Sequence, residues 1–326
     1  MQGSRVIVVL LVSTLLAPGC GDEDPVTVAS PPQVGAVIKG VDNPFFASLR
    51  DGMRDAAASN DVDLEIREAA DLQDTEGQAL AVEALPGADC YVVNPINRTN
   101  LIESLAKVAS GKPVVAVDSP LDQQAAEAAG IDLRSYVGTD NEAVGRLGAR
   151  ALDDRLPPGA AVAVITGIPG DAGSEARARG FVSGARGKLD VVAQVSADFD
   201  EEQARQAVRA ILDVEPELGG VFAVNDDMAL GAARAVPGED RLTVIGVDGI
   251  SRALASIRRG ELTGTVTQFP YLIGQLGVEA CVASVEGRRL PANVDAPIEL
   301  ITSKNVDDVI RSRPSPGGGY ESPFDR

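Results

Sequence analysis

The sequence predicts an α/β fold with a doubly wound parallel sheet, and two observations support this. Short apolar runs rich in Val and Ile recur from residue 34 onward, and a helix-like stretch follows each run. Runs that are apolar throughout, rather than alternating with polar residues, are typical of parallel strands covered on both faces by helices. The runs are VGAVIKG (34–40), DCYVVNP (89–95), PVVAVDS (113–119), AVAVITG (161–167), GVFAVND (220–226) and LTVIGVD (242–248).

The bulk composition narrows the class of protein. The chain has 326 residues, enough for one large domain or two lobes of ordinary size. Its net charge of −19 opposes contact with phosphate backbones, so no nucleic-acid partner is expected. The acidic residues are dispersed, which indicates a solvated surface. The chain contains no His, which excludes His-based catalytic triads and His metal sites, and we expect neither a metal nor a cofactor.

The N-terminal segment resembles a lipoprotein signal. Residues 1–20 combine one Arg with the short apolar run VIVVLLVSTLL and end in LLAPGC. The run is too short to span a bilayer as a helix but suits a signal peptide. We expect cleavage before Cys20, lipidation of Cys20 and a polar tether over residues 21–33. Ordinary secretion, with Cys20 as a leftover thiol, is the alternative.

Two further regions are assigned from composition. Cys90 lies in a strand-like run and Cys281 in a helix-like run, which favours two buried free thiols. A disulfide between them stays open, because spacing cannot decide the pairing. Residues 311–326 end in a stretch rich in Pro and Gly and are expected to be disordered.

The stretch NPFF (43–46) begins the first predicted helix. Asn43 is a good N-cap, and Pro44 fits the first helical position. Phe45 and Phe46 fall in the first turn, on a face that continues with Leu49 and other apolar residues at helical spacing. The pair can therefore belong to the core. The turn also follows the C-terminal end of a strand, where open α/β sheets bind ligands, so one ring is expected to contact a ligand.

Polar side chains end four of the six apolar runs. They are Asn94, Asp118, Asn225 and Asp248, and Asp226 is placed to cap the helix that follows. Each alone is more often a cap or a turn residue than a ligand contact. Together, on the sheet edge that faces the binding crevice, they suit a neutral ligand with many hydroxyl groups, because amides and carboxylates donate to and accept from hydroxyls.

Two other kinds of site are weakly supported. The loop TGIPGDAGSEARARG (166–180) could cradle phosphate, but it lacks the P-loop ending and the dinucleotide-binding spacing. It is better interpreted as a turn that delivers Arg177 and Arg179. Paired carboxylates could serve a glycosidase, with Asp118 and Asp248 as candidates, although nothing marks one of them as a proton donor.

The ordered segments DNPFF, VVNP, VAVD, SEARARG, ADFD, VFAVNDDMALGA, VIGVDG and TVTQFP resemble the periplasmic sugar-binding proteins of ABC importers, in particular the ribose-binding group. The resemblance covers about residues 34–305. It implies the type I periplasmic binding protein fold, with two α/β lobes joined by three crossovers and the sugar between them. The lactose-repressor family shares this scaffold, but it would need a DNA-binding segment where this chain has a signal segment.

The resemblance also implies lobe boundaries and ligand contacts. The N-terminal lobe would comprise residues 34–134 and 269–296, and the C-terminal lobe residues 135–268 and 297–310. The ligand contacts implied are Asn43, Phe45, Phe46, Asn94, Asp118, Arg177, Phe199, Asn225, Asp248 and Gln268. Phe199 would cover one face of the sugar, and Gln268 would lie near a hinge crossing.

Two positions depart from the ribose-binding pattern. Ser119 stands where ribose binders carry Arg, and Lys39 stands where they carry Ser near the end of the first strand. We hypothesise that Lys39 partly replaces the missing Arg but addresses different hydroxyls. The ligand would then be a pentose or hexose other than ribose, or a polyol. The alternative is that Lys39 points to solvent.

The function implied is that of a lipid-anchored binding protein, in the periplasm or at the cell surface. It would act as a monomer, without catalysis, by closing two lobes on a monosaccharide or polyol and delivering it to an ABC permease. A sugar sensor for a membrane receptor or kinase would use the same cleft residues and stays open, with a glycosidase as a remote alternative.

Overall fold

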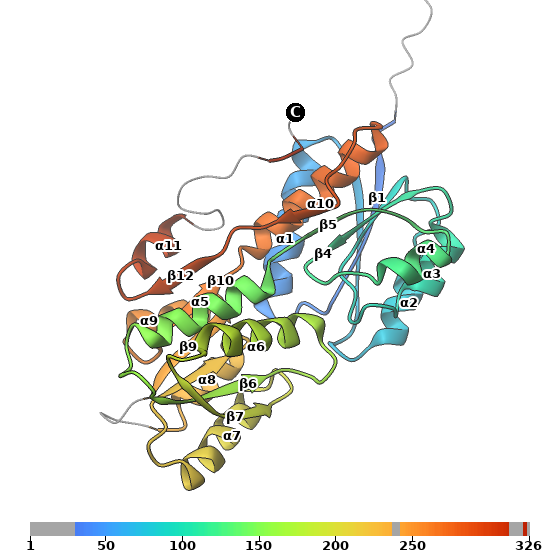
Figure 1. The fold of residues 1–326 in the computed structure, drawn as a ribbon. Helices are drawn as coiled ribbons and strands as arrows, with labels where there is room; N and C mark the ends of the chain where they lie inside the picture. Colours follow the sequence, from blue (N-terminus) through green and yellow to red (C-terminus); the bar gives the residue numbers. More distant parts are fainter. Residues whose placement is uncertain (1–29, 237–241, 313–321, 325–326) are drawn as a thin grey trace, which may run out of the picture. The chain divides into compact units, whose positions relative to one another are not determined.

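The computed structural model describes residues 30–236, 242–312 and 322–324 (Figure 1). The expected signal peptide, Cys20 and most of the expected tether lie outside these ranges. Gln33, the last residue assigned to the tether, instead begins a strand that pairs with its neighbour. Among the described residues, no helix is both long enough and apolar enough to cross a membrane.

The N-terminal lobe is built on a parallel sheet with the strand order β11-β5-β4-β3-β1-β2. Its strands are β1 (Gln33–Ile38), β2 (Asp63–Glu68), β3 (Cys90–Val93), β4 (Pro113–Val117), β5 (Asp132–Gly138) and β11 (Asn293–Asp295). Its helices are α1 (Pro44–Ser59), α2 (Thr75–Glu83), α3 (Ile102–Val108), α4 (Gln123–Ala128) and α10 (Pro270–Val285).

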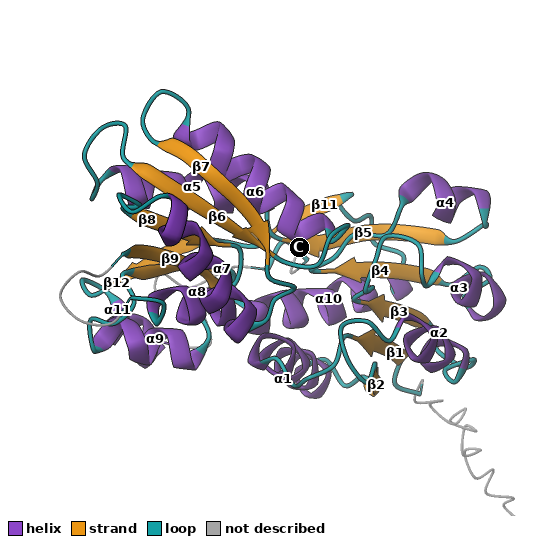
Figure 2. Cartoon of the chain, turned by 90° about the horizontal axis from the view of Figure 1, so that it is seen from below, coloured by secondary structure: helices purple, strands orange, loops and turns teal. Residues whose placement is uncertain are grey.

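Helices cover both faces of this sheet, which explains why its central strands are apolar throughout (Figure 2). On β3, Cys90 and Val92 pack with α1 and α10, whereas Tyr91 and Val93 pack against the helices of the opposite face. Because successive side chains of a strand point to opposite faces, a strand buried on both faces needs an unbroken apolar run.

The C-terminal lobe repeats this arrangement with the strand order β12-β10-β9-β8-β6-β7, in which only β12 is antiparallel to its neighbour. Its strands are β6 (Ala161–Thr166), β7 (Asp190–Ser196), β8 (Gly220–Ala223), β9 (Thr243–Asp248), β10 (Gly264–Thr267) and β12 (Glu299–Thr302). Its helices are α5 (Asn141–Asp153), α6 (Ala172–Ala185), α7 (Glu201–Val214), α8 (Asp226–Ala233), α9 (Ser251–Arg258) and α11 (Val306–Ser312).

The strand order reverses at the same point in each lobe. β1 lies between β2 and β3, and β6 lies between β7 and β8. In doubly wound sheets the ligand crevice opens at this switch point, outside the C-terminal ends of the strands. The predicted α/β fold with two doubly wound parallel-sheet lobes is therefore confirmed, and each lobe offers one such edge.

Three crossovers join the lobes, after β5, after β10 and after β11. The boundary expected at residue 134 is wrong, because it falls inside β5. Ser135, Tyr136 and Val137 pair with β4 of the N-terminal lobe, so the first crossover begins after Gly138. This strand was not predicted because its first residues are mostly polar and only its end is apolar.

The expected disordered tail, residues 311–326, is also corrected in part. α11 continues to Ser312, and residues 322–324 are ordered against the N-terminal lobe. The Phe324 ring is buried in the core formed by α1 and α10, and the Arg288 guanidinium donates to the Phe324 carbonyl. The remaining tail residues lie outside the described ranges.

Cys90 and Cys281 form a disulfide between β3 and α10, so the favoured assignment of two free thiols is wrong. The sequence separation of 191 residues includes the C-terminal lobe from α5 to β10, but not its last strand and helix, β12 and α11. The bond therefore ties the returning segment of the N-terminal lobe to the segment that the chain forms first. Both cysteines lie in the apolar core, and apolar surroundings in the sequence favoured the assignment of two buried free thiols.

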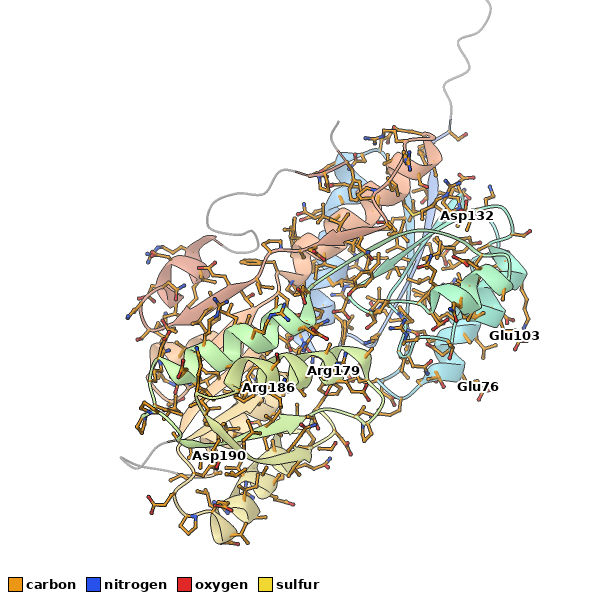
Figure 3. All side chains as sticks on the ribbon, in the orientation of Figure 1. Glu76, Glu103, Asp132, Arg179, Arg186 and Asp190 are labelled. Atoms are coloured by element: carbon orange, nitrogen blue, oxygen red, sulfur yellow. A yellow bond between two sulfur atoms is a disulfide. The ribbon has the colours of Figure 1, made fainter. Side chains whose placement is uncertain are left out.

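The acidic side chains that give the chain its net negative charge are dispersed over the outer surface, as expected (Figure 3). Glu76 on α2, Glu103 on α3 and Asp190 on β7 are all exposed and lie on separate elements. The carboxylates that are buried are few, and they gather at the sheet edges described next.

Candidate functional site

A cavity of about 390 Å³ is lined by residues from both lobes, at the C-terminal ends of the sheet strands. Its volume falls in the range of about 300–1,000 Å³ that is usual for small-molecule sites. The lining side chains predicted from the sequence are Lys39, Asn43, Phe45, Phe46, Asp118, Ser119, Arg177, Phe199, Asn225 and Asp248. The two lobes contribute corresponding groups, each giving a cation, a carboxylate, an asparagine and at least one aromatic ring.

The wall of the N-terminal lobe is a chain of hydrogen bonds directed at Asp118. The Lys39 ammonium donates to Ser119 Oγ at 2.8 Å, and Ser119 Oγ lies 3.3 Å from Asp118 Oδ2. The amide of Asn94 donates to the same carboxylate oxygen at 2.9 Å. Within the described part of the chain, the other oxygen, Asp118 Oδ1, accepts no protein hydrogen bond and is left for a ligand.

Lys39 does not point to solvent, since only 6% of the residue is exposed. Its Nζ atom lies 4.0 Å from Asp118 Oδ2 and 5.5 Å from the centroid of the Phe46 ring. An ammonium has three N–H donors, and Ser119 takes one of them. The cation is therefore held in the cavity wall by a hydroxyl, a carboxylate and an aromatic face, with donors to spare.

The Phe45 and Phe46 rings belong to both the core and the cavity wall. They lie edge to face with their centroids 5.2 Å apart, and both pack into the core beneath α1. Asn43 begins this helix as predicted, because its Oδ1 atom accepts from the Phe45 N–H at 2.8 Å. That bond uses the amide oxygen, so the Nδ2 group of Asn43 is the part available to a ligand.

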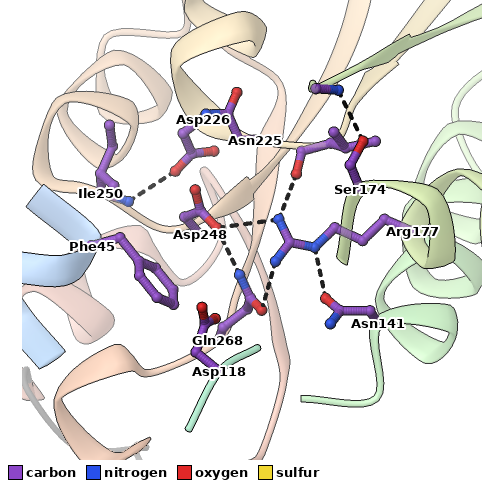
Figure 4. A network of polar contacts seen from close by, with 12 residues as sticks. Phe45, Asp118, Asn141, Ser174, Arg177, Asn225, Asp226, Asp248, Ile250 and Gln268 are labelled. Carbon is purple, nitrogen blue, oxygen red and sulfur yellow. Dashed lines mark hydrogen bonds and ion pairs between the residues drawn. The ribbon is translucent and has the colours of Figure 1, made fainter. Parts of the chain in front are cut away.

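The wall of the C-terminal lobe is organised by Arg177 of α6 (Figure 4). Its guanidinium donates to Asn141 Oδ1 at 2.7 Å, to the Val224 carbonyl at 2.7 Å and to Gln268 Oε1 at 3.1 Å. These acceptors come from the start of α5, the end of β8 and the hinge segment after β10. The planar group is thereby fixed before any ligand arrives.

Asp248 ends β9 and faces this guanidinium. Its Oδ1 atom accepts from Gln268 Nε2 at 2.6 Å and lies 3.6 Å from Arg177 Nη1. Burial raises the pKa of Asp248 to about 7, although the Arg177 charge acts in the opposite direction. Within the described residues, Asp248 Oδ2 accepts no protein hydrogen bond, which matches the free oxygen of Asp118 in the other lobe.

Strained backbone gathers at the cavity. Asp118, Phe199 and Asp248 have φ angles of 59°, 63° and 111°, which residues other than glycine rarely adopt. The Phe199 ring lies over Gly167, where a Cβ atom would stand 2.1 Å from the ring. Strain of this kind persists where the surroundings enforce it, most often at binding sites.

Two predicted ligand contacts lie behind the cavity wall rather than in it. Asn94 and Gln268 are fully buried and do not line the cavity. Asn94 holds Asp118, while Gln268 holds both Asp248 and Arg177. Both amides therefore support the groups that line the cavity, and their own contact with a ligand stays a prediction.

Sequence reasoning missed part of the lining. The unpredicted members are Leu72, Gln73, Thr75, Ile96, Asn97, Asn141, Ile168, Pro169, Gly170, Asp171 and Gly173. Most follow β2, β3 or β6, so the rule that ligands meet strand ends could have found these loops. Asn141 was missed because the strand before it was not recognised. Arg179, which the same loop was expected to deliver, is exposed and forms ion pairs with Glu142 and Glu175.

Each lobe places one cation beside one carboxylate in the cavity wall. Lys39 faces Asp118 in one wall, and Arg177 faces Asp248 in the other. Such pairs donate to and accept from hydroxyl groups. Asp171, which caps α6, adds a further carboxylate to the lining, so the cavity favours a neutral ligand over an anionic one. Among the described residues, no cluster of His, Cys, Asp and Glu could hold a metal ion.

Comparison with known proteins gives a consistent result. A family model described as the periplasmic binding protein domain matches residues 34–289. The ribose import binding protein of Bacillus subtilis is 35% identical over 312 residues, which cover 92% of this chain and 99% of that protein. The D-allose-binding periplasmic protein of Escherichia coli is 30% identical over 281 residues, covering 83% and 90% of the two chains.

A solved structure has the same fold. The periplasmic solute-binding protein of an ABC transporter from Actinobacillus succinogenes, with bound D-allose, superposes with a TM-score of 0.78 and 30% sequence identity. The match covers 85% of this chain and 100% of that chain.

Proposed function

Because this chain belongs to the periplasmic binding protein family, we propose that it is the extracytoplasmic sugar-binding subunit of an ABC importer. It captures a neutral monosaccharide or polyol between its two lobes and delivers it to the permease. The observation that supports this most directly is the cavity, in which each lobe presents one carboxylate with a free oxygen beside a buried cation.

The cavity chemistry fits a ring or chain that carries several hydroxyl groups. A hydroxyl can donate to Asp118 Oδ1 or Asp248 Oδ2 while it accepts from the neighbouring Lys39 or Arg177. Phe45, Phe46 and Phe199 supply apolar surface for the C–H faces of the same ligand. The relatives named for ribose and D-allose support this ligand class.

Ligand contacts from both walls provide the differential free energy that favours a closed arrangement of the lobes. A ligand shifts such an equilibrium only as far as its contacts differ between the two states. Here the binding groups are divided between strand ends of two separate sheets. The closed form docks on the permease and releases its ligand for import, without making or breaking a bond.

The identity of the ligand is set in part by Lys39. Its ammonium and the Ser119 hydroxyl stand side by side at the end of the N-terminal sheet, so they define one donor position in the cavity. We assign this position to a ligand hydroxyl that also meets Asp118.

The anchor is a lipidated Cys20 followed by a short tether, as the sequence of residues 1–33 indicates, and the protein acts as a monomer.

Titration calorimetry on the ligand-free protein tests the proposal. The panel comprises D-ribose, D-allose, D-arabinose, D-fucose, xylitol and myo-inositol, with D-glucuronate as a charged comparison. We expect one or more neutral members to bind with a dissociation constant below about 10 μM, a gain of about 7 kcal/mol, and D-glucuronate to bind at least about tenfold more weakly. No detectable binding of any neutral member would overturn the proposal.

A further inference from the structure

Asp226 is a buried carboxylate that lies outside the cavity lining. The sequence placed it as the cap of α8, but the structure gives that role to Asn225, whose Oδ1 atom accepts from the Met228 N–H at 3.0 Å. Asp226 is instead the first residue of the helix and is fully buried. An isolated acid at such a position is costly to bury, so its partners indicate what it does.

The Asp226 carboxyl group connects three elements of the C-terminal lobe. Its Oδ2 atom accepts from the Ile250 N–H at 2.8 Å, and its Oδ1 atom lies 2.6 Å from Thr265 Oγ1 on β10. Gly246 of β9 leaves the space for it, because a Cβ atom there would stand 2.4 Å from Asp226 Oδ1. Helix α8, strand β10 and the turn after β9 therefore meet at this one side chain.

The turn that Asp226 holds is the turn that carries Asp248. Asp248 and Gly249 have φ angles of 111° and 72°, and Ile250 follows them directly. Asp248 is not a glycine, so this backbone conformation needs outside support. The bond from Ile250 to Asp226 supplies that support two residues beyond Asp248, and Figure 4 shows this bond with Asp248 close to it.

We propose that Asp226 is a positioning residue for ligand binding, which acts by holding the β9–α9 turn in the conformation that directs Asp248 at the cavity. Asp226 does not touch the ligand. The proposal deepens the proposed function and depends on it for the identity of the ligand, whereas the geometry of Asp248 can be examined without one.

The charge state of Asp226 sharpens the proposal. Burial raises its pKa well above the ordinary range, and the Asp248 carboxylate raises it further. The charges that act on Asp248 are those of Arg177 on α6, Asp227 on α8 and Asp118 from the other lobe. Both effects favour the protonated form of Asp226. A neutral acid accepts from Ile250 through one oxygen and bonds Thr265 through the other, and an asparagine amide can make the same two bonds.

Three variants separate this role from a general structural one. Asp226→Ala removes both bonds, whereas Asp226→Asn keeps the shape and the neutral hydrogen-bonding pattern. Asp227→Asn removes the neighbouring carboxylate, which pairs with Arg252 on the surface, and serves as the matched control. Affinity for the tightest-binding panel sugar is measured by calorimetry, and crystal structures of the ligand-free variants report the φ angle of Asp248.

We expect Asp226→Ala to lower the affinity by about tenfold or more, because a buried hydrogen-bonding group loses its partner. In its ligand-free structure, Asp248 leaves the left-handed region and loses Gln268. Asp226→Asn and Asp227→Asn stay within about threefold of the wild type and keep the Asp248 conformation.

An Asp226→Ala structure with Asp248 unmoved would overturn the proposal, and so would equal losses of affinity in the Ala and Asn variants. If no panel sugar binds the wild type, the proposed function fails, and the ligand-free structures still decide whether Asp226 positions Asp248.

Discussion

The Nζ atom of Lys39 lies 2.8 Å from the Oγ atom of Ser119, although the two residues are 80 positions apart in the sequence. The first follows β1 and the second follows β4, so the sheet brings a cation and a hydroxyl together at its ligand-facing edge. The same hydroxyl lies 3.3 Å from Asp118, which makes the three side chains one donor and acceptor unit.

Replacement of Lys39 by methionine tests this unit. Lys39→Met keeps the apolar stem beside Phe46 but removes every N–H donor. We expect the affinity for the best panel sugar to fall by about 10- to 150-fold, because hydrogen bonds to charged groups contribute about 1.5–3 kcal/mol. Discrimination among the panel sugars should weaken as well, which calorimetry with each sugar will show.

The matched control is Lys107→Met, which removes a half-exposed lysine paired with Glu83 and Glu103, none of which lines the cavity. It should bind as the wild type does. Tight and selective ribose binding that is unaffected by Lys39→Ala would contradict the assignment of Lys39.

Ligand affinity should rise with pH through about pH 7. Burial raises the pKa of Asp248 from 3.8 to about 7 in the ligand-free protein. A ligand hydroxyl that donates to the carboxylate favours its ionised form, so binding lowers this pKa and releases a proton. Affinity is then greatest above pH 7 and falls as the pH decreases below it. Calorimetry in two buffers of different ionisation enthalpy measures the released proton.

Asp248→Asn should bind more weakly and should lose this pH dependence. The stability of the ligand-free protein has the opposite sign, since a raised acid pKa stabilises the fold below about pH 4 and loses that contribution as the pH rises to 7. A wild-type affinity that is constant between pH 6 and 8 would exclude Asp248 as an ionised ligand contact.

Much of the fold and the site could be predicted from the sequence, because the apolar runs end at the edge of each sheet that lines the cavity. Asp118 and Asp248 end the strands that correspond in the two lobes, and both face the cavity. The rule that polar residues at strand ends meet the ligand does not distinguish residues that line the cavity from residues that hold them in place. Asn94 and Gln268 look like ligand groups in the sequence, yet hydrogen bonds to the contact residues use their amides.

The strands β2, β5 and β7 were not predicted, because polar residues interrupt each of them. β2 and β7 lie at sheet edges, and their exposed faces are polar, so neither is an apolar run. β5 contains Arg134 and Ser135 and pairs with the short β11, which follows it by more than 150 residues in the chain. The disulfide partner of Cys90 lies 191 residues away in the sequence, and the packing of α10 on β3 brings Cys281 to it.

Replacing the flat ring of Phe199 should weaken binding without unfolding the protein. Phe199→Leu keeps apolar volume over Gly167 but removes the planar face. Aromatic contacts contribute about 0.5–1.5 kcal/mol beyond the area they bury, so we expect affinity to fall by about 2- to 12-fold. Calorimetry and thermal unfolding measure the two effects separately.

Phe324→Leu is the control for this variant, because Phe324 is buried in the N-terminal lobe away from the cavity lining. It should leave affinity unchanged and lower the unfolding temperature instead. The reverse pattern, with affinity lost at Phe324 and kept at Phe199, would show that the Phe199 ring does not face the ligand.

The disulfide should stabilise the protein without shaping the site. Reduction of Cys90–Cys281 frees a closed loop that spans 191 residues, and we expect the free energy of unfolding to fall by about 2–5 kcal/mol. Denaturant unfolding with and without reductant measures this loss. The double variant Cys90→Ala/Cys281→Ala should show a similar loss and no response to reductant. Ligand affinity of the folded protein should not change, and a large change would connect the bond to the cavity.

The central claim is that one neutral ligand connects Asp118 of the N-terminal lobe with Asp248 of the C-terminal lobe. A crystal structure with the tightest-binding panel sugar tests it most directly. The account predicts density in the cavity, with ligand hydroxyl oxygens within about 3 Å of Asp118 Oδ1 and of Asp248 Oδ2. A ligand that contacts only one of these carboxylates, or that binds outside the cavity, would contradict it.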